Sequence, residues 1–162
     1  METQNQIAVE LIKLCARKRL TVSTAESCTG GLIAKLLTDV AGSSAVFYGA
    51  CVTYTNEVKM NLLGVDPTII EQYTEVSHAC AKAMADGARQ KIGTTFGIST
   101  TGYAGPGGGT DTDPVGTVYI AISTPDGTFS ERFSAPSTLD RMGVREATAI
   151  RALEMLKNIV QD

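Results

Sequence analysis

A length of 162 residues, 43% of them hydrophobic, predicts one domain with a substantial core. The formal net charge of -3 gives no basic surface of the kind that binds nucleic acid. Because no stretch reaches the roughly 18 apolar residues of a membrane span, and no signal-peptide pattern opens the chain, we expect a cytoplasmic protein that binds neither nucleic acid nor membrane.

Hydrophobic periodicity predicts helices that alternate with strands. Helical spacing of Ile7, Leu11 and Leu14 marks the buried face of a first helix, and β-branched and aromatic runs mark the strands. Gly64 fits a helix end and Ser77 a helix N-cap. In chain order we expect a helix over 4–17, a strand over 20–24, a helix over 32–41, a strand over 46–54, helices over 55–63, 67–72 and 78–91, strands over 96–101, 117–124 and 128–134, and a helix over 139–160.

The order of these elements indicates an α/β protein. A Pro125-Asp126-Gly127 turn joins the last two strands as a hairpin. Small residues on the inner face of the helix over 78–91 imply close packing on a sheet. Since neither a repeat nor a linker interrupts the chain, residues 1–162 are expected to form a single-domain α/β/α sandwich. Its sheet should be mixed, mostly parallel, and end in an antiparallel hairpin.

Residues 23–31 (STAESCTGG) join the first strand to the second helix. This position places Ser27 and Cys28 near the free N–H groups of a helix N-terminus, which can stabilise an oxyanion or hold a phosphate. The paired glycines Gly30 and Gly31 allow a substrate to approach closely. A purely structural alternative is that Ser27 or Thr29 caps the helix. The segment alone leaves both interpretations open.

A glycine-rich loop follows the apolar strand over 96–101, with six glycines between Gly102 and Gly116. It is not a Walker A motif, because no lysine follows Gly107 and Gly108, and Thr110 replaces the last glycine of a G-x-G-x-x-G fingerprint. Ligands of open α/β sheets bind beyond the carboxyl ends of strands, and loop amides can bind anions. We therefore expect a ligand loop, with a flexible connection as the alternative.

A reactive serine needs an activating base. A Ser-His-Asp arrangement would require His78, on the first turn of an alanine-rich helix, whereas a Ser-Lys arrangement would use Lys59. Burial would lower the pKa of Lys59 enough for it to act as a base. Cys28 is a rival nucleophile, or else an inert buried thiol. The lone histidine and the scattered cysteines predict free thiols and no metal site (Cys15, Cys28, Cys51, Cys80).

Several motifs together resemble one known family. They are residues 25–31 (AESCTGG), 42–44 (GSS), 54–59 (YTNEVK), 63–65 (LGV), 102–109 (GYAGPGGG) and 114–118 (PVGTV). Their types and order are similar to those of the CinA C-terminal domain family, over nearly the whole chain. Members are nicotinamide-nucleotide amidohydrolases (NMN deamidases, PncC type), which convert nicotinamide mononucleotide and water to nicotinate mononucleotide and ammonia in pyridine nucleotide salvage. Larger CinA proteins add an N-terminal domain, and this chain looks like the stand-alone form.

The resemblance implies Ser27 as nucleophile and Lys59 as its base, with Tyr54 nearby, and neither metal nor cofactor. Tyr103 departs from it, since many relatives have isoleucine there. A homodimer is expected. A non-catalytic nucleotide-binding module and a Cys28 thiol hydrolase remain as competing classes. Arg141 is a further phosphate candidate. The residues expected to bind the mononucleotide are Thr29, Gly30, Gly31, Ser44, Gly102, Ala104, Gly105, Gly107 and Arg145.

Overall fold

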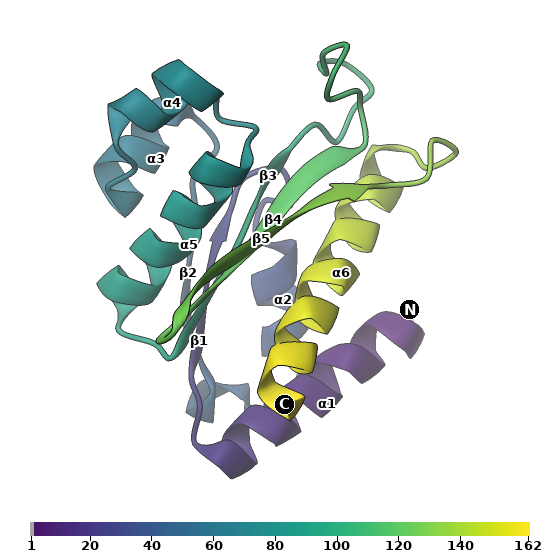
Figure 1. Cartoon of the computed structure of the whole chain (residues 1–162). Coiled ribbons are helices and arrows are strands. Elements are labelled where there is room, and N and C mark those ends of the chain that lie inside the picture. Colours follow the sequence, from purple (N-terminus) through teal and green to yellow (C-terminus); the bar gives the residue numbers. More distant parts are fainter. Residues whose placement is uncertain (1) are drawn as a thin grey trace.

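The computed structural model describes the backbone of residues 2–162 and the side chains of residues 6–162 (Figure 1). Every expected element is present within this range, with ends that differ from the prediction by a few residues. The elements are α1 (Glu2–Lys18), β1 (Val22–Glu26), α2 (Leu32–Thr38), the 3₁₀ helix η1 (Ser43–Ala45), β2 (Phe47–Val52), α3 (Asn56–Leu63), α4 (Pro67–Tyr73), α5 (His78–Ile92), β3 (Phe96–Gly102), β4 (Thr117–Thr124), β5 (Gly127–Ser134) and α6 (Arg141–Gln161).

The five strands within residues 2–162 form one sheet in the order β2-β1-β3-β4-β5. Strands β2, β1 and β3 run parallel, whereas β4 and β5 are added antiparallel as a hairpin. The parallel part fits the helices that connect its strands, and the hairpin fits the short turn before Gly127. The predicted fold class, with its mixed sheet and its antiparallel end, is confirmed.

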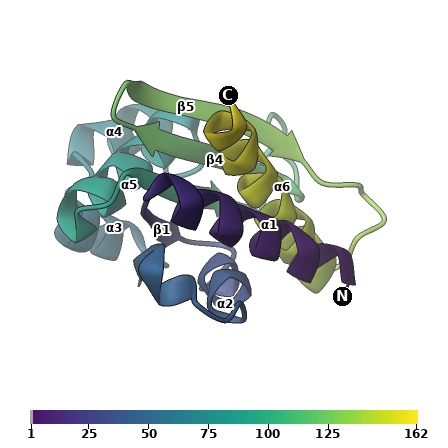
Figure 2. The same ribbon diagram turned by 90° about the horizontal axis from the view of Figure 1, so that it is seen from below.

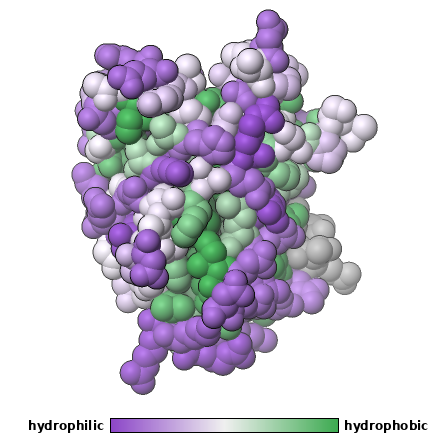
Figure 3. Space-filling model, in the orientation of Figure 1, coloured by the Kyte–Doolittle hydropathy of each residue, from purple (hydrophilic) through white to green (hydrophobic). Residues whose placement is uncertain are grey.

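Helices cover both faces of the sheet. Figures 1 and 2 show α1, α2 and α6 gathered on one side and α3, α4 and α5 on the other. Helix α5 packs closely, because a Cβ added at Gly97 of β3 would lie 2.3 Å from the carbonyl oxygen of Ala85. The outer helix surfaces are mostly hydrophilic, while apolar side chains reach the surface between β5 and α6 (Figure 3). No helix within residues 2–162 combines the length and the apolar character required to cross a membrane.

The end of β1 is tied to the start of α2 by a buried carboxylate. Glu26 is fully buried. Its oxygens accept the backbone N–H groups of Ile33 (2.9 Å) and Ala34 (3.0 Å) and the hydroxyls of Thr24 (3.2 Å) and Thr29 (2.7 Å). An anion at a helix N-terminus is favoured by the helix dipole as well as by these donors. Glu26 therefore holds the strand-to-helix turn that carries Ser27.

Glu26→Gln is expected to destabilise the protein by about 2–4 kcal/mol, because the new amide donors would face backbone donors in a buried site. Urea unfolding measures this free energy. Glu57→Gln, at an exposed position of α3, is the matched control and should change stability by less than about 0.5 kcal/mol. Equal unfolding midpoints for the two variants would contradict the proposed importance of this cap.

Candidate active site

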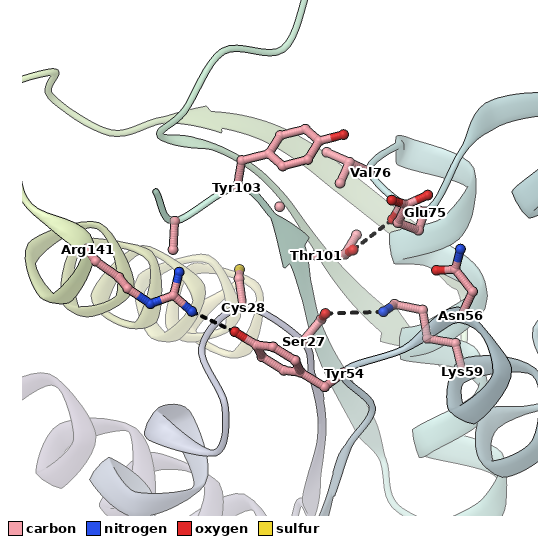
Figure 4. Close-up of a pocket in the computed structure, with 12 residues that line it drawn as sticks. Ser27, Cys28, Tyr54, Asn56, Lys59, Glu75, Val76, Thr101, Tyr103 and Arg141 are labelled. Carbon is pink, nitrogen blue, oxygen red and sulfur yellow. Dashed lines mark hydrogen bonds between the residues drawn. The ribbon is translucent and has the colours of Figure 1, made fainter. Parts of the chain in front are cut away.

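A polar cavity opens at the carboxyl ends of the three parallel strands. Strand β1 ends at Glu26, opposite Val52 of β2 and Thr100 of β3. The segments that follow these strands therefore meet at the carboxyl end of the parallel strands. The cavity has a volume of about 180 Å³ (Figure 4). Its lining residues are Ser27, Cys28, Tyr54, Asn56, Lys59, Glu75, Val76, Thr101, Gly102, Tyr103, Ala104 and Arg141.

Ser27 and Lys59 are in direct contact in this cavity. The Lys59 Nζ donates to the Ser27 Oγ at 3.1 Å and to the Thr53 carbonyl oxygen at 3.0 Å (Figure 4). The lysine is only 1% exposed and the serine 8% exposed. Ser27 comes from the turn after β1, whereas Lys59 lies on α3. The structure thus brings together two residues 32 positions apart in the sequence.

Burial controls the charge of this lysine. Desolvation lowers the pKa of Lys59, because an ammonium loses the stabilising interaction with water. The nearby Cys80, Glu75 and Cys28 act in the opposite direction, and raise that pKa by smaller amounts. When neutral, the amine can accept the Ser27 proton along the same hydrogen bond. The arrangement therefore suits a serine nucleophile with a lysine base.

Tyr54 lines the same cavity, but its hydroxyl is not hydrogen-bonded to Ser27 or Lys59. Its hydroxyl accepts a hydrogen bond from Arg141 Nη2 at 2.7 Å (Figure 4). Arg141 Nη1 also donates to the Gly105 carbonyl oxygen at 2.7 Å. Arg141 thus joins the start of α6 to the segment after β2 and to the glycine loop. The contact identifies Arg141 as the arginine of this cavity.

The turn between β1 and α2 differs from its predicted structure. The first free N–H groups of α2 bind the Glu26 carboxylate, and the helix N-cap is Gly31, with a φ of 96°. The prediction that Ser27 or Thr29 caps the helix is therefore wrong. The prediction that the first amides of α2 are free to bind a substrate anion is also wrong. Thr29 is fully buried and donates to Glu26. It supports the carboxylate instead of lining the cavity.

Arg145 holds the same turn from the other side. Its Nε donates to the Cys28 carbonyl oxygen at 3.1 Å and its Nη2 to that of Thr29 at 2.9 Å. A Cβ at Gly30, where φ is 60°, would lie 3.2 Å from this guanidinium. Gly30 therefore leaves room for Arg145, Gly31 is the N-cap of α2, and neither glycine lines the cavity.

The first residues of the glycine loop line the cavity. Gly102 and Ala104 line the cavity with Ser27. A Cβ at Gly102 would lie 2.4 Å from the Thr117 carbonyl oxygen, so the close approach of β4 requires glycine there. The loop is anchored, because Arg132 Nε and the Tyr119 hydroxyl donate to the Asp113 carboxylate at 2.9 and 3.0 Å. These contacts argue against a merely flexible connection.

The remaining predicted binding residues lie outside this cavity. Gly105 and Arg145 line an adjoining hollow of about 470 Å³, which shares Ala104 and Arg141 with it. Gly107 is exposed in the loop. Ser44 lies in η1 just before β2, at the amino end of the parallel strands, whereas the Ser27 cavity lies at their carboxyl end. Direct substrate contact by Ser44 is therefore inconsistent with a substrate in the Ser27 cavity.

The structure does not assemble the histidine alternative. His78 is exposed, its Nδ1 lies 2.8 Å from the Ser130 Oγ, and its ring packs edge-on against Tyr119. These partners belong to β4 and β5 and not to the Ser27 cavity. Within the described residues, no group of three or more metal-ligating side chains gathers.

Four cavity residues were missed in the sequence: Asn56, Glu75, Val76 and Thr101. Asn56 is the first residue of α3, and Thr101 is the last but one of β3. Their places beside the predicted site residues Tyr54 and Gly102 were a usable signal. Glu75 and Val76 lie in the α4–α5 connection. Their segment has no distinctive motif, and only the packing of α5 on the sheet places them beside Lys59.

Cys28 is poorly suited to act as the nucleophile. It is 6% exposed, and burial raises the pKa of its thiol to about 12. A thiol with this pKa is protonated at neutral pH, whereas the thiolate is the reactive form. We expect Cys28→Ala to keep turnover within about tenfold of the wild type, measured as ammonia release from a carboxamide substrate. Cys15→Ala, at another buried cysteine, controls for lost packing. Abolished turnover in the Cys28 variant alone would contradict this assignment.

Comparisons with known proteins agree on one family. The family model described as the CinA C-terminal domain matches residues 4–160. A CinA-like protein of Myxococcus xanthus is 50% identical over 151 residues, which are 93% of this chain and 35% of that protein. A CinA-like protein of Synechocystis is 44% identical over 163 residues, which are 99% of this chain and 39% of that protein. The chain therefore spans somewhat over a third of these relatives.

Solved structures show the same fold. The competence/damage inducible protein CihA of Agrobacterium tumefaciens superposes with a TM-score of 0.94 at 40% identity, covering 99% of this chain and 96% of that one. A CinA superfamily protein of Escherichia coli superposes with a TM-score of 0.91 at 30% identity, covering 96% and 90%.

Proposed function

The chain belongs to the CinA C-terminal domain family, and from this premise we propose that it is an amidohydrolase that converts nicotinamide mononucleotide and water to nicotinate mononucleotide and ammonia. The observation that carries the proposal is the buried Ser27–Lys59 hydrogen bond of 3.1 Å at the base of a cavity. Amide hydrolysis requires a nucleophile and a group that moves protons. This pair supplies both.

The reaction then proceeds in two stages. Neutral Lys59 takes the Ser27 proton while the Ser27 oxygen attacks the carboxamide carbon. The resulting ammonium of Lys59 gives that proton to the departing nitrogen, so ammonia leaves and an ester to Ser27 remains. Water, deprotonated by Lys59, attacks this ester, and the Ser27 oxygen regains a proton. The acid product and the original enzyme result.

The tetrahedral intermediate requires a donor to its oxyanion. The amides of Ile33 and Ala34 are bonded to Glu26, so they do not serve. The candidate is the backbone N–H group of Cys28, a residue that lines the cavity and whose N–H donates to no carbonyl oxygen in the described part of the chain. Cys28 directly follows the nucleophile, as an oxyanion donor often does.

The phosphate end of the substrate is assigned to the arginine side of the site. Arg141 borders both the Ser27 cavity and the adjoining hollow that Arg145 lines. Guanidinium groups bind phosphate oxygens through paired hydrogen bonds. A net acidic protein must supply such positive charge locally. The two hollows together provide room for a mononucleotide, with the amide near Ser27 and the phosphate beyond Arg141.

The test is ammonia release by the purified protein from nicotinamide mononucleotide, with a chelator present. Nicotinamide is the control substrate, because it has the amide but lacks the ribose phosphate. Release from the mononucleotide and far less from nicotinamide is expected. Binding of the mononucleotide without release would favour the non-catalytic binding module, and neither binding nor release would contradict the proposal.

A further inference from the structure

Glu75 is an acidic residue on the wall of the cavity, and the mechanism above does not use it. It lies in the short connection between α4 and α5. Its carbonyl oxygen accepts the Thr101 hydroxyl at 2.7 Å, the next residue, Val76, is buried, and Ser77 caps α5. The backbone of Glu75 is thus attached to β3 and α5. Its side chain lines the cavity together with Ser27 and Lys59.

The carboxylate oxygens of Glu75 are available to a ligand. Within residues 6–162, whose side chains the structure describes, no donor binds this carboxylate and no cation pairs with it. Glu26 is the contrast, since four donors occupy its oxygens. A partly buried carboxylate without a cation partner favours positive charge in the space that it faces. Glu75 raises the pKa of Lys59, while burial lowers it by more. In the mechanism above Lys59 is neutral when the substrate binds, and in that form it does not cancel the charge of Glu75.

The charges of the cavity are separated. Figure 4 shows Arg141 beyond the Ser27 end of the Ser27–Lys59 pair and Glu75 above its Lys59 end, with the rings of Tyr54 and Tyr103 at the cavity walls. Aromatic faces also attract cations. A ligand that carries a cation near its amide and an anion at its other end would match this separation. Nicotinamide mononucleotide has such charges, because its amide-bearing ring is a pyridinium and its phosphate is anionic.

We propose that Glu75 is a specificity residue that selects a cationic, oxidised pyridinium ring over a neutral ring of the same shape. The proposal rests on the proposed function and deepens it, because it names the charge state of the ring that the site accepts. The carboxylate would lie against the positive ring while Ser27 reaches the amide carbon. A neutral ring would leave that carboxylate without a counter-charge.

The experiment compares nicotinamide mononucleotide with benzamide riboside 5′-phosphate, whose ring has carbon in place of the charged nitrogen. Glu75→Gln is expected to lower kcat/KM for the cationic substrate about tenfold and to change it about twofold or less for the neutral one. Glu75→Asp, which keeps the charge, should restore part of the preference. Glu71→Gln is the matched control, because it removes one charge from an exposed position of α4.

Binding separates this inference from the proposed function. In Ser27→Ala protein, calorimetry should show tighter binding of the cationic ligand than of the neutral one, and Glu75→Gln should remove the difference. This result would support the inference even if the wild type released no ammonia. The inference is overturned if the two ligands bind equally, if neither binds, or if Glu75→Gln weakens both to the same extent.

Discussion

Ser27→Ala is expected to lower kcat for ammonia release by about four orders of magnitude or more, since the variant has no oxygen to form the ester. Lys59 Nζ is hydrogen-bonded to the Ser27 Oγ at 3.1 Å, and to no other hydroxyl in the described part of the chain. Affinity for the mononucleotide should change by only a few fold, because the ester bond forms after binding. Rapid-quench kinetics and calorimetry measure the two quantities.

Ser130→Ala is the matched control for the nucleophile. It also removes a serine hydroxyl, but one that pairs with His78 on the hairpin side of the sheet. This variant should retain most of the wild-type rate. Turnover that survived Ser27→Ala, or that disappeared in Ser130→Ala, would refute the assignment of Ser27.

Lys59→Arg is expected to be nearly as damaging as Lys59→Ala, with a loss of about two to four orders of magnitude in kcat. A guanidinium keeps its proton at any accessible pH, so it cannot accept the Ser27 proton. Because Lys59 is 1% exposed, the larger arginine could also disturb the site. Lys59→Met separates the two effects, since it keeps about the same side-chain length without a basic nitrogen. This variant should be equally inactive, and its circular dichroism spectrum should be that of the folded wild type.

The pH dependence of kcat/KM tests whether Lys59 acts as a base. Burial lowers the pKa of Lys59, so the neutral, reactive amine is present at a lower pH than for a free lysine. The value of kcat/KM should therefore rise as pH increases through that lowered pKa, and fall as Lys59 becomes protonated below it. Lys82→Arg, at an exposed position of α5, should keep both the rate and the profile. An active Lys59→Arg enzyme would exclude the general-base role and favour a lysine that only binds phosphate.

Local signals in the sequence determined the elements and their order. Gly64 ends α3 in a left-handed conformation, and the Ser77 hydroxyl accepts the Cys80 N–H at the start of α5, as predicted. Hairpin and helix patterns act over a few residues, so they are readable without knowledge of the fold. The family resemblance, which uses the order of whole motifs, also predicted Ser27 and Lys59 as a nucleophile and its base.

Only the tertiary structure decided what these residues contact. Parallel pairing of β1 with β2 and β3 brings Ser27 beside Lys59 at the carboxyl end of the strands, and it places Ser44 at their amino end. The amides of Ile33 and Ala34 are not an open anion site, because the side chain of Glu26, at the end of β1, accepts both of them. Likewise, α6 directs Arg141 into the cavity and Arg145 onto the turn. Such contacts depend on strand order and helix packing, which join residues far apart in the chain, and a local pattern carries no information about them.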